Sequence, residues 1–435
     1  MKSKWVWLMS FIVFIDLSAF AQDNKSLSIH EVIQLATTQS KEAKVADNKI
    51  IGKNLELGAA KNAQLPEAKI TGQFAVLSTP DINLRIPVGN ENGTASIKAN
   101  QLMLGQASIS MPIYSGGKIK NSIHIAETSL TAEQYAATNT KEQIASQAIK
   151  LYITLYKAQQ TVNLIHENIK RSEQQVSDFK AMEENGLIAR NDLLKSELQL
   201  SNYQVALQEA IKNVSVFNYQ LIMLLQFDET TKIDQITFDD LSEILNEEFT
   251  FENALQHRND IKSLNAQHQI ATDQLKISKA NYLPSIALTG GYVAADIKNV
   301  ITVTNALNAG IGLSYDLGSL YKNKKNVAVA KHHIEEVEEQ IGITSDRIKI
   351  QLQEAKENFL LAQNKEKVYA QAVTQANENY RIVKDKYDNG VADTDDLLEA
   401  DVQQLQSKIN EAVSKANVIE EYYDLLLVNG QLTSN

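Results

Sequence analysis

Two long stretches that contain no proline place the strongest constraint on how this chain folds. They run from about Lys118 to Glu184 and from about Lys322 to Tyr387. The whole chain of 435 residues has only 5 Pro and 17 Gly, and so few breakers favour long, uninterrupted helices. At a rise of ~1.5 Å per residue, each predicted helix is ~100 Å long. Helices of that length cannot fold back into a compact globule, so we expect them to pack against each other.

Each long stretch ends at a glycine turn and is followed by a second helical stretch. The turns are Asn185–Leu187 and Asn389–Val391, and the restarts are Asp192–Leu194 and Asp396–Leu398. Glycine just after a helix supplies the left-handed residue that ends it. Apolar residues then recur every seven positions: Leu193, Leu200, Leu207, Val214 and Leu221 in one half, and Leu398, Leu405, Ala412, Ile419 and Leu426 in the other. Sustained heptads predict coiled-coil packing between helices.

A pair of strands is predicted before each long helix. Alternate residues share a face in each strand: Ile70, Gly72, Phe74 and Val76; Met103, Gly105, Ala107, Ile109 and Met111; Ile286, Leu288, Gly290 and Tyr292; Leu307, Ala309, Ile311, Leu313 and Tyr315. A shorter helix comes before each pair and stops at a Leu-Pro step, Leu65-Pro66 or Leu283-Pro284. Ser28 and Thr250 are the expected N-caps of these helices, and Glu31 completes a capping box with Ser28.

The same order of elements therefore occurs twice. We predict a first repeat over residues 22–227, an acidic linker over 228–248 with weak strand character at Ile233–Phe238, and a second repeat over 249–435. The halves differ mainly inside the strand pairs, where the first has the longer loop. Variable length of this kind belongs in exposed loops.

Residues 1–21 have the pattern of a cleaved Sec-type signal peptide. Lys2 and Lys4 precede an apolar run, Trp5–Phe14, and Ala19–Ala21 is a small-residue cleavage site. The alternative is an uncleaved membrane anchor, but the run is shorter than the ~20 residues that span a bilayer. No later segment has the pattern of a membrane-spanning helix. The expected mature chain starts at Gln22 and is either soluble beyond the inner membrane or embedded as a β-barrel.

Composition and motifs argue against several classes of function. A net charge of -11 disfavours nucleic-acid binding, and the absence of cysteine excludes disulfides, thiolate sites and an acyl anchor on an N-terminal cysteine. His30–Gln34 lacks the second histidine of a zinc protease motif, and His332 and His333 point to different helix faces. Phosphate-loop and G-x-S-x-G motifs are absent from the sequence. We therefore predict no enzyme activity, no metal site and no cofactor.

Four strands cannot close a barrel on their own. The smallest membrane barrels have about 8 strands, and lipid does not tolerate open sheet edges. Four strands per chain imply either a soluble sheet or a barrel shared between chains. A shared barrel that continues into a helical barrel accounts for both the strands and the long helices.

On these features the chain resembles the TolC-type outer-membrane efflux proteins, also called outer membrane factors. The residues that carry the resemblance are the start Ser28–Val32, the two Leu-Pro steps, the segment Ser110–Gly117 before the long helix, and the two Asn-Gly turns. No single motif is specific, but their order, spacing and duplication together are. The resemblance covers essentially the whole mature chain.

The resemblance implies a fold that is mainly α with β. It implies a homotrimer whose 12-stranded transmembrane β-barrel, with four strands per chain, lies in outer-membrane lipid and continues as a long periplasmic α-helical coiled-coil barrel. The linker and the C-terminus would form an equatorial region. The implied function is a passive exit duct of a tripartite efflux or type I secretion system. Its partners would be a periplasmic adaptor (membrane fusion protein) and an inner-membrane pump of RND, ABC or MFS type. The alternative is a non-channel periplasmic coiled-coil scaffold or adaptor.

The resemblance also assigns residues near the Asn-Gly turns, which it makes the periplasmic tips. Asp396 and Glu399 match a carboxylate ring that narrows the pore and favours cations, although the family has Asp where Glu399 stands. Both lie on one helix face, and three chains would supply six carboxylates. The alternative is that they are ordinary acidic residues at a helix start.

Asp192 and Tyr387 match two residues of the polar contacts that hold the family's tip shut. The basic partner does not carry over, because the matching position is Ala392, so Arg190 and Lys195 are the candidate substitutes. The alternative for Tyr387 is a packed aromatic residue in the last helical turn.

Four further tip residues are the expected adaptor-docking positions: Gly186, Leu187, Gly390 and Val391. Exposed apolar residues at a turn usually indicate a contact surface. The alternative is local helix-cap packing, which also favours an apolar residue after the glycine.

Overall fold

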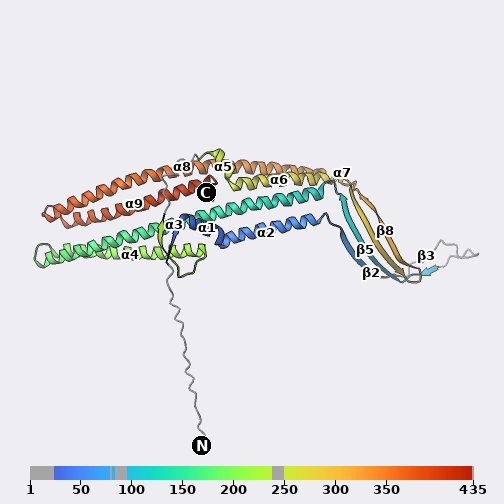
Figure 1. Cartoon of the computed structure of the whole chain (residues 1–435), viewed down its shortest axis with the longest axis horizontal. Coiled ribbons are helices and arrows are strands. Elements are labelled where there is room, and N and C mark those ends of the chain that lie inside the picture. Colours follow the sequence, from blue (N-terminus) through green and yellow to red (C-terminus); the bar gives the residue numbers. More distant parts are fainter. Residues whose placement is uncertain (1–23, 79–80, 84–95, 238–248, 434–435) are drawn as a thin grey trace, which may run out of the picture. The chain divides into compact units, whose positions relative to one another are not determined.

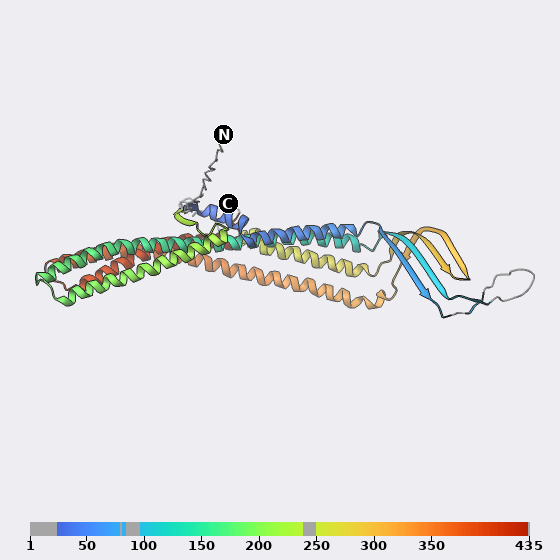
Figure 2. The same ribbon diagram turned by 90° about the horizontal axis from the view of Figure 1, so that it is seen from below.

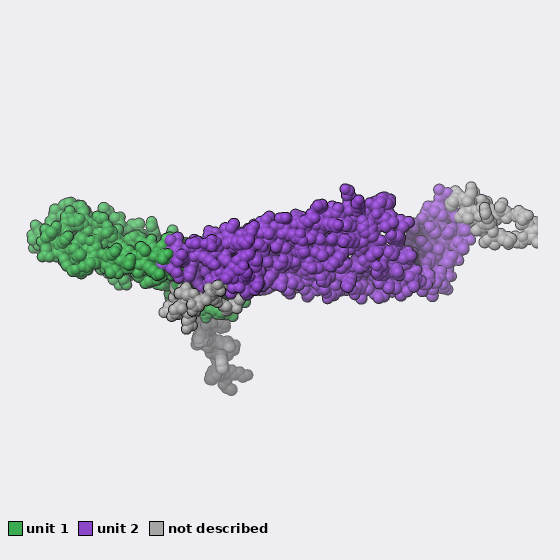
Figure 3. Space-filling view, turned by 90° about the horizontal axis from the view of Figure 1, so that it is seen from above, with its two compact units in different colours: residues 1–40, 147–245, 364–420 green, residues 41–146, 246–363, 421–435 purple. Residues whose placement is uncertain are grey.

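The computed structural model describes residues 24–78, 81–83, 96–237 and 249–433 (Figure 1). The predicted signal peptide and residues 238–248 of the predicted linker lie outside this range. The chain divides into two compact units (Figure 3). Unit 1 comprises 1–40, 147–245 and 364–420, and unit 2 comprises 41–146, 246–363 and 421–435. None of the helices in the described part combines enough length with enough apolar character to cross a membrane.

The described residues form long helices and a smaller amount of sheet. The helices are α1 (Ile29–Gln39), α2 (Lys41–Asn62), α3 (Lys118–Glu184), α4 (Arg190–Leu225), α5 (Phe251–His257), α6 (Asn259–Ala280), α7 (Ser319–Lys322), α8 (Lys324–Asp388) and α9 (Thr394–Val428). The strands are β1 (Asn24–Ser28), β2 (Glu67–Val76), β3 (Asp81–Asn83), β4 (Ser96–Lys98), β5 (Gln101–Tyr114), β6 (Lys232–Thr237), β7 (Ser285–Ile297) and β8 (Ile301–Ser314).

The long helices agree closely with the prediction. The helix α3 has the predicted bounds, whereas the second long helix α8 begins at Lys324, after the one-turn helix α7. Each of the shorter helices has a break that its sequence pattern did not predict. The first breaks at Ser40, between α1 and α2, and the second breaks at Arg258, between α5 and α6. Both residues have extended backbone angles, with ψ of 150° at Ser40 and 125° at Arg258.

The two predicted strand pairs form one antiparallel sheet in unit 2, in the order β2-β5-β7-β8. The inner strands β5 and β7 come from different repeats and pair along most of their length. Phe74 lies opposite Met103, Ile109 opposite Gly290, and Leu288 opposite Ile311. Residues directly opposite one another in an antiparallel pair share a face, so the predicted apolar faces of all four strands lie on the same side of the sheet.

Two short strand pairs complete the sheets of the described chain. In unit 1, β1 pairs in parallel with β6, with Asn24 opposite Lys232. The weak strand character predicted for Ile233–Phe238 is therefore confirmed as far as Thr237, and Phe238 lies outside the described residues. The strand β1 was not predicted. In unit 2, β3 and β4 pair beyond the first strand pair.

Unit 1 is built around two helical hairpins, α3 with α4 and α8 with α9 (Figure 2). Among the described residues, its core includes two apolar clusters. One contains Ile165, Ile169, Tyr203, Ala210 and Leu405, and the other contains Phe179, Leu193 and Leu397. Several predicted heptad positions are buried, among them Leu193, Leu221 and Leu405. The coiled-coil prediction therefore identified the side of each helix that faces the core.

Candidate functional site

The turns that end α3 and α8 have the same backbone structure. Gly186 and Gly390 adopt left-handed φ angles of 70° and 72°. The N–H of Leu187 donates to the Met182 carbonyl at 2.8 Å, and the N–H of Val391 donates to the Lys386 carbonyl, also at 2.8 Å. Each turn is thus a Schellman cap, which uses carbonyls that the helix end would otherwise leave unpaired.

The residues after both glycines are exposed. Leu187 has 71% of its surface accessible and Val391 has 75%. Local cap packing therefore does not describe these two side chains in the single chain, whereas their neighbour Ile188 does pack against the tip core. Two apolar side chains at the ends of the hairpins are available for contact. Their role in docking stays a prediction.

The side chain of Tyr387 makes packing contacts and no hydrogen bond within the described part of this structure. Its ring stacks on Phe179 with 5.5 Å between centroids and an interplanar angle of 19°. Its hydroxyl is inaccessible and has no hydrogen-bond partner among the residues that the structure describes, so it does not bond to Asp192 in the single chain. The contacts present in one chain are those of the packed aromatic residue that the sequence left open as an alternative.

Lys195 provides an ionic contact between the two hairpins. Its Nζ lies 2.7 Å from the Oδ2 of Asp395 on α9 and 4.0 Å from the Oδ1 of Asp192 on its own helix. The hydrogen bond with Asp395, together with the charges of Asp395, Asp192 and Asp393, raises the pKa of Lys195. Lys195 was a predicted candidate for the basic partner, but Asp395 was not predicted, because helical periodicity on α9 does not show which residue faces α4.

Asp396 and Glu399 are both exposed near the start of α9. The N–H of Asp396 donates to Asp393 Oδ1 at 2.9 Å, and the N–H of Asp393 donates weakly to Asp396 Oδ2 at 3.5 Å. Glu399 accepts a hydrogen bond from Gln403 at 3.0 Å. Asp396 therefore helps to cap α9. The carboxylates of Asp396 and Glu399 both stay at the surface, so this capping is compatible with the predicted role in a carboxylate ring.

A buried polar layer lies between the two apolar clusters of unit 1. Asp401 on α9 accepts hydrogen bonds from Tyr203 of α4 at 2.8 Å and from Asn168 of α3 at 3.1 Å. Arg171 lies 3.8 Å from the same carboxylate. Burial, with the negative charge of Asp401, raises the pKa of Tyr203. This layer joins both hairpins, and sequence reasoning missed it because Asp401 has the sequence pattern of a surface acid.

The candidate metal and enzyme signals take structural roles. Glu31 completes the predicted capping box, since its Oε2 accepts from the N–H of Ser28 at 2.7 Å. His332 and His333 each contact a different glutamate one turn away. Within the described ranges, no group of three His, Asp or Glu side chains is placed to hold a metal ion.

The comparisons with known proteins give one consistent family. The model of the outer membrane efflux protein family matches residues 250–431. The second half of this chain is an outer membrane efflux protein domain. Across more of its length, the chain is 20% identical over 387 residues to the outer membrane efflux protein BepC of Brucella suis biovar 1 (strain 1330). That alignment covers 86% of this chain and 79% of BepC.

Solved structures show that the likeness in fold extends to both halves. The VceC outer membrane protein of Vibrio cholerae superposes with a TM-score of 0.76 at 15% identity, covering 92% of this chain and 96% of VceC. The CmeC outer membrane channel of Campylobacter jejuni has a TM-score of 0.75 at 16% identity, covering 96% of this chain and 90% of CmeC. At such identities the likeness establishes the fold.

These findings confirm the predicted resemblance and the predicted fold class, mainly α with a four-stranded sheet. The family match and the likeness to BepC support an outer-membrane location and an efflux duct for this chain. The family consists of channels and not of enzymes, so the prediction that this chain is not an enzyme is also confirmed.

Proposed function

We propose that this outer membrane efflux protein is the exit duct of a tripartite efflux or type I secretion system and works as a homotrimer. The observation that carries the proposal is the open sheet of unit 2. Within the described chain, β2 and β8 each pair on one side only. A sheet edge of this kind must be covered or paired, and lipid cannot satisfy it. Pairing β8 of one chain with β2 of the next, three times over, would close the sheet.

The two faces of the sheet suit opposite surroundings. One face carries Ile70, Phe74, Met103, Leu288 and Ile311, and Ile70 is 89% exposed in the single chain. The other face carries Thr71 opposite Gln106, Ser108 opposite Gly291, and Thr289 opposite Gly310. Strands of outer-membrane barrels alternate in this way, with apolar residues toward lipid and polar residues toward the lumen. We assign the apolar face to outer-membrane lipid.

The tip residues fit the same proposal. Three copies of the exposed pair Asp396 and Glu399 around a narrow throat would repel anions and concentrate cations. The exposed Leu187 and Val391, each beside its turn glycine, Gly186 or Gly390, would meet a periplasmic adaptor, which links the duct to an inner-membrane pump. The Lys195–Asp395 pair would help to hold the hairpins together, in place of the basic residue that is missing at Ala392.

The alternative of a scaffold or adaptor without a channel is disfavoured by the strand pairing. Both strand pairs join in one sheet through β5 and β7, and the sheet then exposes a continuous apolar face. A water-exposed scaffold would carry that face at a cost of ~25 cal/mol for each Å² of apolar surface left in water.

Fractionation of cells that express the full chain tests the duct. The protein should be extracted from outer membranes as a heat-modifiable trimer and should form ion-conducting pores in planar bilayers. Recovery as a monomer in the osmotic-shock supernatant would contradict both the trimer and the membrane location. Trimers without conductance would leave the membrane location standing but refute the duct.

A further inference from the structure

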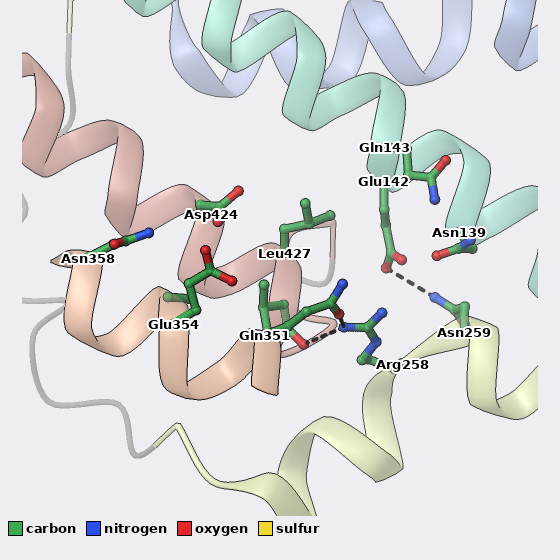
Figure 4. Close-up of a pocket in the computed structure, with 12 residues that line it drawn as sticks. Asn139, Glu142, Gln143, Arg258, Asn259, Gln351, Glu354, Asn358, Asp424 and Leu427 are labelled. Carbon is green, nitrogen blue, oxygen red and sulfur yellow. Dashed lines mark hydrogen bonds between the residues drawn. The ribbon is translucent and has the colours of Figure 1, made fainter. Parts of the chain in front are cut away.

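A polar cavity in unit 2 has no part in the duct described above. Its volume is about 340 Å³, and α3, α6, α8 and the end of α9 line it together with Arg258 of the α5–α6 break (Figure 4). Three carboxylates and one guanidinium face it: Glu142, Glu354, Asp424 and Arg258. The volume falls at the lower end of ligand pockets, which hold ~300–1,000 Å³.

The cavity is built by a close contact that the sequence did not indicate. The α5–α6 break at Arg258 touches the turn after α9, where Gly430 has a φ of 73°. A Cβ at Gly430 would lie 2.8 Å from the backbone nitrogen of Arg258, so only glycine allows this approach. The same turn brings Thr433 within 3.4 Å of Glu142 Oε1.

The guanidinium in the cavity already has a carboxylate partner. Arg258 donates to both oxygens of Asp260, at 3.0 and 2.7 Å. Its Nη1 donates to Gln351 at 2.9 Å and to the Val428 carbonyl at 3.3 Å. Its charge is therefore matched by Asp260, and it does not neutralise the carboxylates that line the cavity.

Glu142 is a buried acid without a cation. It is 3% exposed, and its hydrogen bonds come from two neutral groups, Asn259 at 3.0 Å and Thr433. Among the described residues, neither Glu142 nor Glu354 forms an ion pair. Burial raises the pKa of Glu142, because desolvation disfavours its charged form. A cation that enters the cavity would stabilise the charged form of this buried carboxylate by pairing with it.

We propose that this cavity binds a short aliphatic diamine, with one ammonium group at Glu142 and the other at Glu354. A ligand with two positive charges would match the charges of the two carboxylates that have no ion-pair partner. The cavity wall also includes Ala355, Leu427 and Val428, which suit the methylene chain between them. A diamine matches this set better than a metal ion, because among the described residues no three carboxylates lie close enough together to hold one.

Calorimetric titration of the full chain in detergent with 1,4-diaminobutane tests the site. Saturable binding is expected, with protons released as Glu142 ionises. Glu142→Gln keeps an oxygen that can accept from Asn259 and Thr433 but removes the charge. It should weaken binding ~tenfold or more and abolish the proton release. Glu354→Gln, at an exposed position that the fold does not depend on, should also weaken binding.

The matched control is Glu357→Gln, which alters an exposed acid one turn away on α8 and outside the cavity. It should bind the diamine like the unaltered chain. Absence of saturable binding would overturn the proposal, and so would variants Glu142→Gln and Glu354→Gln that bind the diamine as tightly as the unaltered chain. Binding of Ca²⁺ in place of the diamine would overturn it too. The experiment does not depend on conductance, so the duct and the diamine site can fail separately.

Discussion

Lys195 of α4 and Asp395 of α9 form an ion pair, 2.7 Å between nitrogen and oxygen, that joins the first helical hairpin to the second. Both side chains remain partly exposed, so the contact adds little to folding stability. The position of the ion pair is what matters, because it connects two helical hairpins that must separate if the tip of a duct is to widen.

Removal of this ion pair should favour an open tip. For Lys195→Met we expect a higher open probability in planar bilayers and no measurable change in the thermal unfolding midpoint. The double exchange Lys195→Asp with Asp395→Lys should restore the original behaviour. Lys349→Met, which breaks the exposed pair with Asp346 within one helix, is the control. An open probability that is the same for the unaltered protein and all three variants would show that the pair does not restrain the tip.

Replacement of Asp396 and Glu399 by Ala should reduce cation selectivity and block by divalent cations. The reason is the loss of six carboxylates from the throat of the proposed trimer. Reversal potentials in a salt gradient measure the effect. The control is Glu335→Ala with Glu339→Ala, two acids at the surface of α8 in unit 2. Unchanged selectivity in the tip variant would favour the alternative, in which both acids are ordinary helix-start residues.

Removal of the buried carboxylate of Asp401 should destabilise unit 1. Asp401→Leu leaves the Tyr203 hydroxyl and the Asn168 amide without their acceptor, which costs ~1–3 kcal/mol for each buried group left unsatisfied. Arg171 keeps its hydrogen bond to Asn168. Chemical denaturation of the solubilised protein measures the loss. Asp395→Leu removes an exposed carboxylate of the same helix and should cost far less. Similar losses for both variants would mean that the buried layer does not hold the hairpins together.

The raised pKa of Tyr203 predicts a loss of stability at alkaline pH. The unfolded chain ionises near the ordinary tyrosine pKa of ~10, whereas the folded chain keeps the proton to higher pH. The stability from this group is therefore full below pH ~10 and is lost as pH rises toward the folded pKa. Tyr203→Phe should flatten this part of the pH–stability curve. An unchanged curve would mean that Tyr203 ionises normally in the folded protein.

Gly186, Gly390 and Gly430, which have left-handed φ after the C-terminal ends of helices, should differ sharply in their tolerance of a side chain. At Gly390 a Cβ would meet nothing within 4 Å, so Gly390→Ala should cost only the ~1–2 kcal/mol of the left-handed backbone, and Gly186→Ala should behave alike. At Gly430 a Cβ would contact the backbone of Arg258 and His257 at 2.8 and 2.9 Å. Gly430→Ala should therefore lower the unfolding midpoint much more. Equal midpoints for all three variants would contradict the close approach.

The sequence determined the elements whose signals are local. Proline scarcity indicated long helices, the Asn-Gly pairs marked the hairpin turns at which α3 and α8 end, and period-2 alternation indicated the four long strands. Each signal arises from backbone geometry within a few residues: the proline ring, the left-handed glycine, and alternate side chains on opposite faces of a strand. Ser28 and Glu31 formed their capping box for the same reason.

Contacts between distant segments were decided only by the tertiary structure. Asp401 and Asp395 lie six residues apart on one helix, yet the first is buried against Tyr203 and the second meets Lys195 at the surface. Periodicity shows that a helix has two faces but not which neighbour each face meets. The contact between Arg258 and Gly430 likewise joins two chain segments that are far apart in sequence. No local sequence pattern could therefore predict the cavity around Glu142.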